Sequence, residues 1–232
     1  MIIIDNVDFS YDKKNYIFKG LKAVFDPYKI SVILGPNGVG KTTLLKLIAG
    51  VLSPIRGEIR IFGKRPVELR GKIGYIPQLN GLYPWMRVKE NIELPLRIRS
   101  EDPSKISEIV NKVAEKLSIE ELLNKYPKQL SGGEIQKVQL ARALISGSDL
   151  FLLDEPLSMI DIDYREEIID LLKKIVSTNK STIIMVTHNI EDVLELGDKV
   201  YIMRNKPAEM IEIQKELVNR DNLQKLYRGL NV

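Results

Sequence analysis

The strongest constraint on this fold is a glycine-rich segment that fits a phosphate-binding pattern. Residues 35–42 read G-P-N-G-V-G-K-T and match G-x-x-x-x-G-K-[ST]. The short apolar run 30–34, typical of a strand buried on both faces, precedes the segment, and a helical pattern of leucines follows it. Glycines let such a loop wrap its backbone N–H groups around phosphate oxygens, while the next helix presents its positive end. We therefore expect a strand, a phosphate-binding loop and a helix.

Each part of this loop has a chemical role to play. Lys41 supplies a mobile positive charge, and the Thr42 hydroxyl is a ligand for Mg²⁺. The alternative is an ordinary glycine-rich turn, but the flanking strand and helix are what the phosphate-binding mechanism requires. The residues predicted to bind ATP in this segment are Gly35, Pro36, Asn37, Gly38, Val39, Gly40, Lys41, Thr42 and Thr43.

Strands and helices are expected to alternate along the rest of the chain. Apolar and β-branched runs predict strands at 2–4, 7–11, 17–25, 58–62, 72–76, 150–153 and 182–186, and a hairpin near 205–207. Helical periodicity predicts helices within 102–126, at 134–145 and at 164–176, and a short helix near the end. This alternation, on both sides of a helical block, indicates an α/β fold with a parallel-sheet core and attached subdomains.

Polar residues follow three of the predicted strands. Asp154 and Glu155 end the run 150–153, at the sheet edge where α/β folds keep their ligands. We expect Asp154 to hold Mg²⁺ and Glu155 to polarise the water that attacks the γ-phosphate, although an acidic pair before a proline is also a common turn. His188, the one histidine, is either a packed strand-end residue or a γ-phosphate contact. Gln78 is either a surface glutamine or a bridge between Mg²⁺ and water.

A second candidate anion site lies at residues 131–134. Ser131 is a good helix N-cap, and Gly132 and Gly133 expose the backbone N–H groups of the first turn before Glu134. An ordinary helix cap is the simpler interpretation, but paired glycines at a helix start cost stability and suggest close approach by a ligand. One chain would then carry two phosphate-binding segments, of which only the loop 35–42 is complete. A two-fold dimer would use both segments at once.

Charge, cysteine content and hydropathy exclude several classes. The 35 Lys and Arg residues are scattered among 31 acids, which is unlike a nucleic-acid-binding surface. The absence of cysteine fits a reducing compartment such as the cytoplasm. No apolar run approaches the ~20 residues of a membrane-spanning helix. Any membrane role is therefore expected to be peripheral.

The ordered set of motifs resembles the ATP-binding cassette family of transporters over essentially the whole chain. GPNGVGKTT, Gln78, LSGGE, LLDEP, Asp161 and His188 are similar to its Walker A, Q-loop, signature, Walker B, D-loop and H-loop. The resemblance implies a P-loop NTPase fold: a RecA-like, mostly parallel core with an antiparallel β subdomain and an inserted α-helical subdomain. It implies one domain over 1–232, with the core and β subdomain at 1–78 and 149–232 and the helical signature subdomain at 79–148.

The resemblance also implies roles for single residues. Tyr11 stands where the family has an adenine-stacking aromatic, with Tyr16 as its rival, and either is also acceptable as core. Ser131, Gly132, Gly133, Glu134 and Asp161 would act across the dimer on the partner's nucleotide. Glu155 and His188 would be catalytic, and Thr42, Gln78 and Asp154 would serve Mg²⁺. Lys137 replaces a common arginine, and SMID replaces the commoner SALD.

Partners follow from the same resemblance. The segments 82–88, 90–92 and 201–207 are similar to the nitrate, sulfonate and taurine importer branch. Tyr83, Trp85 and Met86 would then lie near a groove that receives a short helix of a membrane permease, or else form subdomain core. We expect an ATPase on the cytoplasmic face of the membrane, with a second copy, permease subunits and a solute-binding protein as partners. The alternatives are a soluble ATPase of the same family and a non-hydrolysing regulator.

Overall fold

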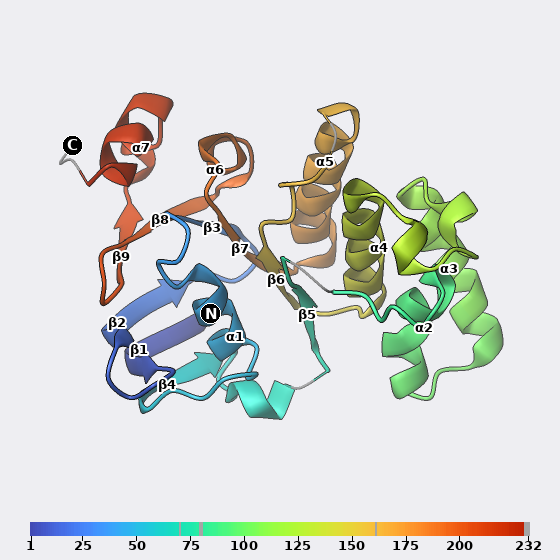
Figure 1. Cartoon of the computed structure of the whole chain (residues 1–232), viewed down its shortest axis with the longest axis horizontal. Helices are drawn as coiled ribbons and strands as arrows, with labels where there is room; N and C mark the ends of the chain where they lie inside the picture. The colour runs from blue at the N-terminus through green and yellow to red at the C-terminus, as the bar shows by residue number, and fades with distance from the viewer. Residues whose placement is uncertain (70, 79–80, 161, 230–232) are drawn as a thin grey trace.

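A mostly parallel six-stranded sheet forms the centre of the computed structural model, which describes residues 1–69, 71–78, 81–160 and 162–229 (Figure 1). In spatial order the strands are β5 (Ile73–Ile76), β6 (Leu150–Asp154), β7 (Thr182–Thr187), β3 (Ile30–Leu34), β8 (Lys199–Arg204) and β9 (Glu209–Ile213). Strands β5 to β8 in this order run parallel, and β9 pairs antiparallel with β8 as a hairpin. The predicted parallel core and hairpin are confirmed.

The central strands are buried on both faces, which explains their unbroken apolar runs. Every residue of β3, β6 and β7 is buried. Along β6, Phe151 and Leu153 pack into one hydrophobic cluster, while Leu150 and Leu152 pack into the other. Alternate side chains thus feed two separate cores, as the two-residue period of a strand requires.

A three-stranded antiparallel sheet and helix α1 (Lys41–Ile48) cover one face of the large sheet (Figure 1). Its strands, in the order β2-β1-β4, are β1 (Ile2–Ser10), β2 (Tyr16–Phe25) and β4 (Arg56–Ile61). The expected separate strands at 2–4 and 7–11 form one strand, because the chain continues through Asn6 at a positive φ of 53° with a register shift. The antiparallel β subdomain is confirmed.

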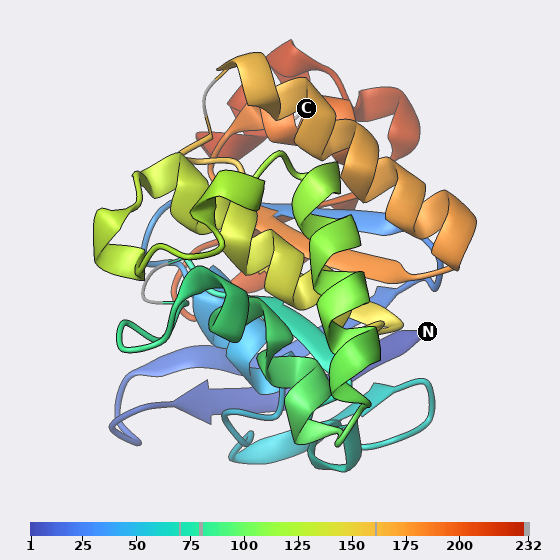
Figure 2. The same cartoon turned by 90° about the vertical axis from the view of Figure 1, so that its right-hand side faces the viewer.

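Helices cover the opposite face, and α2, α3 and α4 gather on one side of the molecule (Figure 2). The helices are α2 (Val88–Ile98), α3 (Pro103–Lys116), α4 (Gly132–Ile145), α5 (Ile162–Asn179), α6 (Ile190–Leu196) and α7 (Arg220–Tyr227). Short 3-10 turns span Pro66–Leu69, Glu120–Leu122, Pro127–Gln129 and Lys215–Leu217. The inserted helical block is thus present, while its boundaries at 79 and 148 stay a prediction. No helix in the described part of the chain is long and apolar enough to cross a bilayer.

The middle of the chain differs most from expectation. Helix α2 had no predicted counterpart because Pro95 lies inside it, and an interior proline normally ends a helix. Helix α3 begins as predicted, with Pro103 in its first turn and the Asp102 side chain accepting from the Ser104 N–H at 2.8 Å. It ends at Lys116, and the rest of the predicted helical stretch holds only the 3-10 turn Glu120–Leu122. The short helix α6 was also missed.

Candidate functional site

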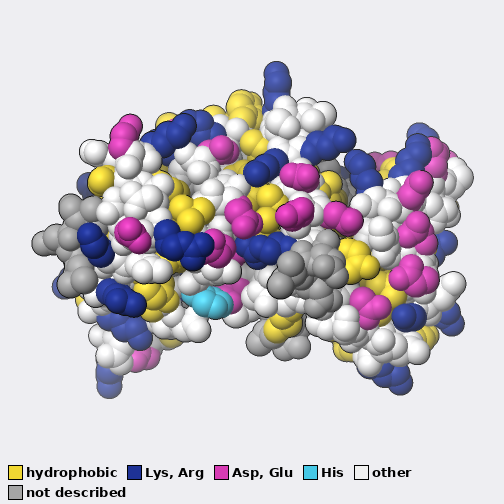
Figure 3. Space-filling view, turned by 90° about the horizontal axis from the view of Figure 1, so that it is seen from above, with side chains coloured by type: hydrophobic (Ala, Val, Ile, Leu, Met, Phe, Trp, Pro, Cys, Tyr) yellow, Lys and Arg dark blue, Asp and Glu magenta, His cyan; other side chains and the backbone are white. Residues whose placement is uncertain are grey.

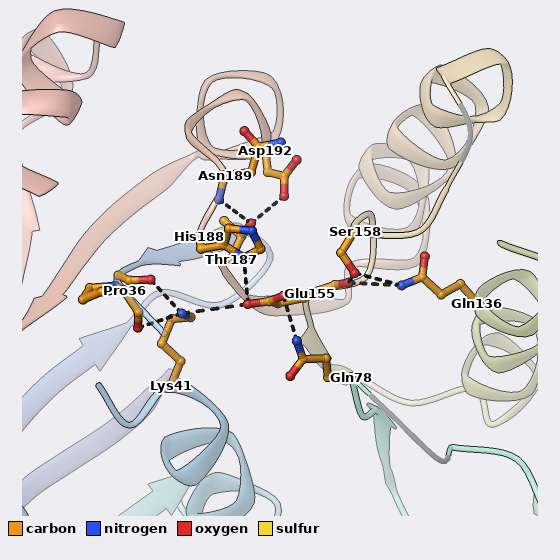
Figure 4. Close-up of polar contacts among 11 residues, drawn as sticks. Pro36, Lys41, Gln78, Gln136, Glu155, Ser158, Thr187, His188, Asn189 and Asp192 are labelled. Carbon is orange, nitrogen blue, oxygen red and sulfur yellow. Dashed lines mark hydrogen bonds and ion pairs between the residues drawn. The ribbon is translucent and has the colours of Figure 1, made fainter. Parts of the chain in front are cut away.

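Four adjacent strands bring the predicted site residues to one edge of the sheet. Strands β5, β6, β7 and β3 are neighbours, and their carboxyl ends lead to Gln78, Glu155, His188 and the loop 35–40 (Figure 4). The backbone N–H of Glu155 donates to the Val186 carbonyl at 3.0 Å, and that of Gly35 donates to the Thr187 carbonyl at 3.3 Å. These bonds lock the strand ends together, so residues far apart in sequence share one site.

The glycine loop is shaped by two close approaches. A β-carbon at Gly35 would lie 2.5 Å from the Met203 carbonyl oxygen, and one at Gly40 would lie 2.7 Å from Ile17. Gly40 also has a φ of 121°, which side-chain-bearing residues rarely adopt. It precedes α1, whose first turn has no capping side chain and no acidic residue. Free N–H groups and the positive helix end are therefore left for an anion.

A cavity of about 340 Å³ lies in front of this loop. It is lined by Ile17, Asn37, Gly38, Gly40, Lys41, Thr42, Thr43, Gln78 and Glu155. The cavity thus joins most of the predicted phosphate loop to the two residues expected to handle the attacking water.

Lys41 is a buried cation directed at this cavity. Its side chain is 6% exposed, and its Nζ donates to the Gly35 carbonyl at 2.6 Å and the Pro36 carbonyl at 3.1 Å. Burial lowers the pKa of Lys41, against the opposing effect of the Glu155 and Asp154 carboxylates. Because Glu155 Oε1 lies 3.9 Å away, the ammonium has only a loose counter-charge. A polyphosphate would supply the missing negative charge.

Glu155 is the point on which the other side chains converge. Its Oε2 accepts from Gln78 Nε2 at 2.9 Å, and its Oε1 lies 3.0 Å from His188 Nδ1 (Figure 4). Because an ionised carboxylate only accepts, Nδ1 must carry the proton in this contact. The His188 side chain is 46% exposed, which argues against a packed structural role. Glu155 is 5% exposed at the cavity wall, a position suited to holding a water molecule as a base.

The residues around Asp154 fit a Mg²⁺ ion. Asp154 is 2% exposed, and its Oδ2 has no hydrogen-bond partner among the described residues. Burial raises the pKa of Asp154, while the Thr42 hydroxyl lowers it. No group of three or more His, Cys, Asp or Glu residues suited to a metal occurs in the described ranges. A divalent ion here would need Thr42, water and phosphate oxygens beside Asp154, which is the ligand set that Mg²⁺ prefers.

The burial of the Asp154 carboxylate leads to a prediction about the stability of the folded protein. Since its folded pKa is above 3.8, the folded protein binds more protons than the unfolded chain between the two values, and stability falls as pH rises through that window. Above this pH window Asp154→Asn removes the cost of burying a charged carboxylate. We therefore expect the free energy of unfolding of the nucleotide-free protein to rise by about 0.5–2 kcal/mol at pH 7. The gain should vanish at pH values below 3.8 where the protein still folds.

Thermal and urea unfolding from low pH to pH 8 measure this difference. Asp149→Asn, at an exposed position just before β6, is the control and should change nothing. A loss of stability in Asp154→Asn at pH 7 would contradict the assignment of an uncompensated buried charge.

The adenine-stacking prediction favours Tyr11 over Tyr16. Tyr11 is 61% exposed, so it is not core, and its hydroxyl lies 3.3 Å from Thr43 Oγ1 in the phosphate loop. Its ring stands edge-on to Phe9 with centroids 5.0 Å apart. Tyr16 is partly buried at the start of β2. An exposed ring anchored to the phosphate loop is available for stacking, and that role stays a prediction.

The segment predicted to be a second anion site lies at the start of α4, where Ser131 is the N-cap as predicted, while anion binding there stays a prediction. Ser131 Oγ accepts from the Glu134 N–H at 3.2 Å, and Glu134 Oε2 accepts from the Ser131 N–H at 2.6 Å, which is a capping box. Gly132 is exposed and Gly133 partly so. A cavity of about 240 Å³ includes Ser131, Gly133 and Glu134 but none of the residues that line the cavity at the glycine loop. Within one chain, therefore, the start of α4 does not close over the phosphate-binding loop of the same chain. Asp161 lies outside the described residues.

Several residues that support the site were missed from the sequence. Gln136 bonds to the backbone after β6. Asp192, 3% exposed, accepts from Thr187 Oγ1 at 2.6 Å and pairs with Arg165 at 2.6 Å, which fixes the turn carrying His188. These residues carry no motif of their own. The only feature that could have marked them is that they are polar residues at buried positions, and the burial is known only from the structure.

Fold and site together define a P-loop nucleotide-binding cassette: a glycine loop after β3, an acid pair after β6, and polar residues after β5 and β7. The chain belongs to the ABC transporter family, whose model matches residues 18–158. It is 43% identical to a molybdate/tungstate import ATP-binding protein of Pyrococcus horikoshii over 74% of this chain and 51% of that relative, so it spans about half of that protein.

Two further comparisons concern the fold and the similarity to importers of the nitrate, sulfonate and taurine branch. The chain is 38% identical to a taurine import ATP-binding protein of Pelagibacter ubique over 78% of this chain and 68% of that protein. A dimeric ATP-binding cassette solved in a post-hydrolysis state with ADP and Pi superposes with a TM-score of 0.83. That structure is 27% identical and covers 92% of this chain and 99% of its own. The fold of the family is thus that of this chain.

Proposed function

We propose that this chain is the ATP-binding and ATP-hydrolysing subunit of an ABC importer. The observation that carries the proposal is the convergence on Glu155: Gln78 at 2.9 Å, His188 at 3.0 Å and Lys41 at 3.9 Å surround one buried carboxylate beside the phosphate loop. A structural acid would need no such set of polar and charged groups around an open cavity.

Each residue has a role in this proposal. The loop and Lys41 bind the β- and γ-phosphates, and Tyr11 stacks on adenine. Glu155 takes a proton from the attacking water, held in place by Gln78, while His188 contacts the γ-phosphate. Asp154 and Thr42 would hold Mg²⁺, which would supply positive charge to offset the negative charge of the phosphates.

The working unit is proposed to be a two-fold dimer. The seat at Ser131, Gly132 and Gly133 shares no cavity with the cradle of its own chain, so it is available to a nucleotide held by a second copy. Asp161 would reach across the same contact. The similar cassette solved with ADP and Pi is dimeric. ATP does work on the membrane subunits because it binds the closed dimer better than the open one.

Two measurements on the purified chain test this function. It should release phosphate from ATP only with Mg²⁺, and its mass by light scattering should double when hydrolysis is blocked. Phosphate release separates this function from a non-hydrolysing regulator. A soluble ATPase of the same family would hydrolyse ATP but would bind no membrane subunit.

A groove beside the helices is the proposed docking site for a permease. It has a volume of about 530 Å³ and runs from β5 to α2, including Gly74, Leu82, Tyr83, Ile98 and Arg142. Tyr83 is 41% and Trp85 is 71% exposed, so these two rings are not core, while Met86 is half-buried. Such exposed aromatic side chains are typical anchors for a partner helix.

The charge of the groove indicates the chemistry of its occupant. Arg142 stands 5.8 Å from the Tyr83 ring and forms no ion pair with any described residue. Burial lowers the pKa of its guanidinium, which marks a charge that lacks compensation. The turn that carries Tyr83 is held by buried Asn91, whose amide bonds to Tyr83 in both directions at 2.7 and 3.1 Å. A short apolar helix with an acidic side chain would fit this surface.

Trp85 lies beside the groove, with its ring centroid 5.4 Å from that of the groove-lining Tyr83, and Trp85→Ala tests the docking site. Removing an anchor of this type costs about 2 kcal/mol or more of binding energy, so we expect affinity for the permease subunits to fall at least ~30-fold. Binding to those subunits in lipid nanodiscs measures the change. Tyr28→Ala, at another exposed aromatic (57%) that does not line the groove, is the control. Equal affinities for parent and Trp85→Ala would rule out this surface.

The cargo and location follow from the partners. Relatives are named for import of molybdate or tungstate and of taurine, so a small oxyanion or sulfonate delivered by a solute-binding protein is the proposed cargo. Docking through the groove would hold the chain peripherally at the cytoplasmic face of the membrane. The face seen in Figure 3 mixes basic and acidic side chains, unlike a nucleic-acid-binding stripe.

A further inference from the structure

Gln136 forms a polar link between the second anion seat and the backbone of Glu155. It lies on α4, five residues after Ser131, and is 7% exposed. Its Nε2 lies 3.3 Å from both the Glu155 carbonyl and Ser158 Oγ (Figure 4). Its Oε1 accepts from the Met159 N–H at 3.2 Å. Ser158 Oγ itself donates to the Glu155 carbonyl at 3.0 Å. One amide therefore holds both ends of the turn after β6.

The first turn of α4 contacts the same segment. A β-carbon at Gly132 would lie 3.2 Å from Met159 Sδ, and one at Gly133 would lie 3.1 Å from the Met159 carbonyl oxygen. Met159 is thus packed against the two glycines, and Glu155, Ser158 and Met159 are bonded to Gln136 on the following turn of the helix. A shift of the seat along α4 must be passed to this segment, because close contacts of this kind transmit displacement.

The conformation of Glu155 makes it sensitive to such a shift. Its φ is 53°, a left-handed value that is strained for a residue with a side chain and persists only where the surroundings fix it. The N–H is fixed by Val186, and the carbonyl is fixed by Gln136 and Ser158. Loss of the carbonyl contacts would free the backbone to relax. The carboxylate would then swing away from Gln78 and His188.

We propose that Gln136 is a positioning residue that aligns Glu155 for the nucleotide in its own cradle when the seat on α4 receives the nucleotide of the partner copy. The inference rests on the proposed dimer. In that dimer α4 faces one nucleotide while Glu155 serves the other, so Gln136 connects the two reaction sites through a neutral amide. Hydrolysis at the two sites is then cooperative in ATP.

Mixed dimers with one active site each test the direction of this effect. In the first, one copy carries Gln136→Met and the other carries Glu155→Gln, so turnover occurs beside the altered Gln136. In the second, both changes are on the same copy, so turnover occurs beside an intact Gln136. Met fills the space of Gln without its bonds. Single-turnover phosphate release should be about 10- to 100-fold slower in the first dimer than in the second, the usual effect of misplaced catalytic groups.

A matched control and two contrary outcomes complete the test. Gln139→Met alters a buried amide one turn further along α4, 3% exposed and without a described hydrogen bond to residues 155–159, and should give equal rates in both dimers. Equal rates for the two Gln136→Met dimers overturn the proposal. Equal slowing of both, relative to the unaltered dimer with one Glu155→Gln copy, also overturns it, because Gln136 would then act at the interface.

A second variant covers the case in which Gln136→Met does not fold. Gln136→Glu keeps the acceptor for the Met159 N–H but loses the donor to the Glu155 carbonyl. We expect it to slow turnover in the same cis arrangement and to lower the Hill coefficient for ATP from near 2 toward 1 in the homodimer. An unchanged coefficient rejects the coupling. If the unaltered chain neither dimerises nor hydrolyses ATP, the proposed function fails instead, and this is seen before any Gln136 variant is made.

Discussion

Glu155→Gln should lower ATP hydrolysis by about 10²- to 10⁴-fold, the usual contribution of a general base. The amide keeps the size of the carboxylate, so the cavity and Lys41 remain available to bind MgATP. Because hydrolysis is what lets the two copies dissociate, we expect the variant to remain an ATP-bound dimer. Phosphate release and light scattering measure the two effects on one sample.

The single histidine of the chain adds a spectroscopic readout to this variant. His188 Nδ1 donates to Glu155 Oε1 at 3.0 Å in the parent. In Glu155→Gln the amide oxygen best faces the Gln78 donor, which leaves its NH₂ group toward Nδ1. We therefore expect the proton to move to Nε2, and ¹⁵N shifts report this without ambiguity because no other histidine is present.

The control for this variant is the same chemical change at an exposed acid. Glu108 on α3 pairs only with Lys112 among the described residues, and Glu108→Gln should leave hydrolysis unchanged. If Glu155→Gln turned over ATP at the parent rate, the base would have to lie elsewhere. The convergence of three side chains on Glu155 would then need another explanation.

Lys41→Met should abolish tight ATP binding. Removing one partner of a buried charge pair costs about 2–5 kcal/mol, so affinity for MgATP should fall by roughly 30- to 5,000-fold. The nucleotide-free protein should not lose stability, because burial lowers the pKa of Lys41 and its charge is a net cost to the empty fold. Loss of binding without loss of stability distinguishes a ligand-directed cation from a structural one.

Titration with a fluorescent ATP analogue and thermal unfolding measure these quantities. Lys46→Met removes the same charge from the same helix, at a partly buried position outside the cavity lining, and should weaken binding far less. Equal losses for the two variants would mean that Lys41 contributes only to the general electrostatic field.

The contiguous features were determined by the sequence alone. The glycine loop lies between β3 and α1 as predicted, because strand, loop and helix are neighbours in the chain and each follows from local periodicity. The Ser131 cap was predicted for the same reason, since a capping box involves residues three apart. Helix α2 was not predicted, because an interior proline such as Pro95 normally disfavours a helix. In the folded protein the burial of Asn91, Ile92 and Leu96 outweighs this local preference.

Only the tertiary structure decided what surrounds Glu155. Gln78 is 77 residues away in sequence and His188 is 33 away, and Gln136 reaches the same backbone from a different element. Their meeting depends on the spatial order β5-β6-β7-β3, which differs from the order in the chain. Local periodicity fixes which face of a strand is buried, but not which strand becomes its neighbour. That choice is made when the two cores pack, and it turns separate polar residues into one site.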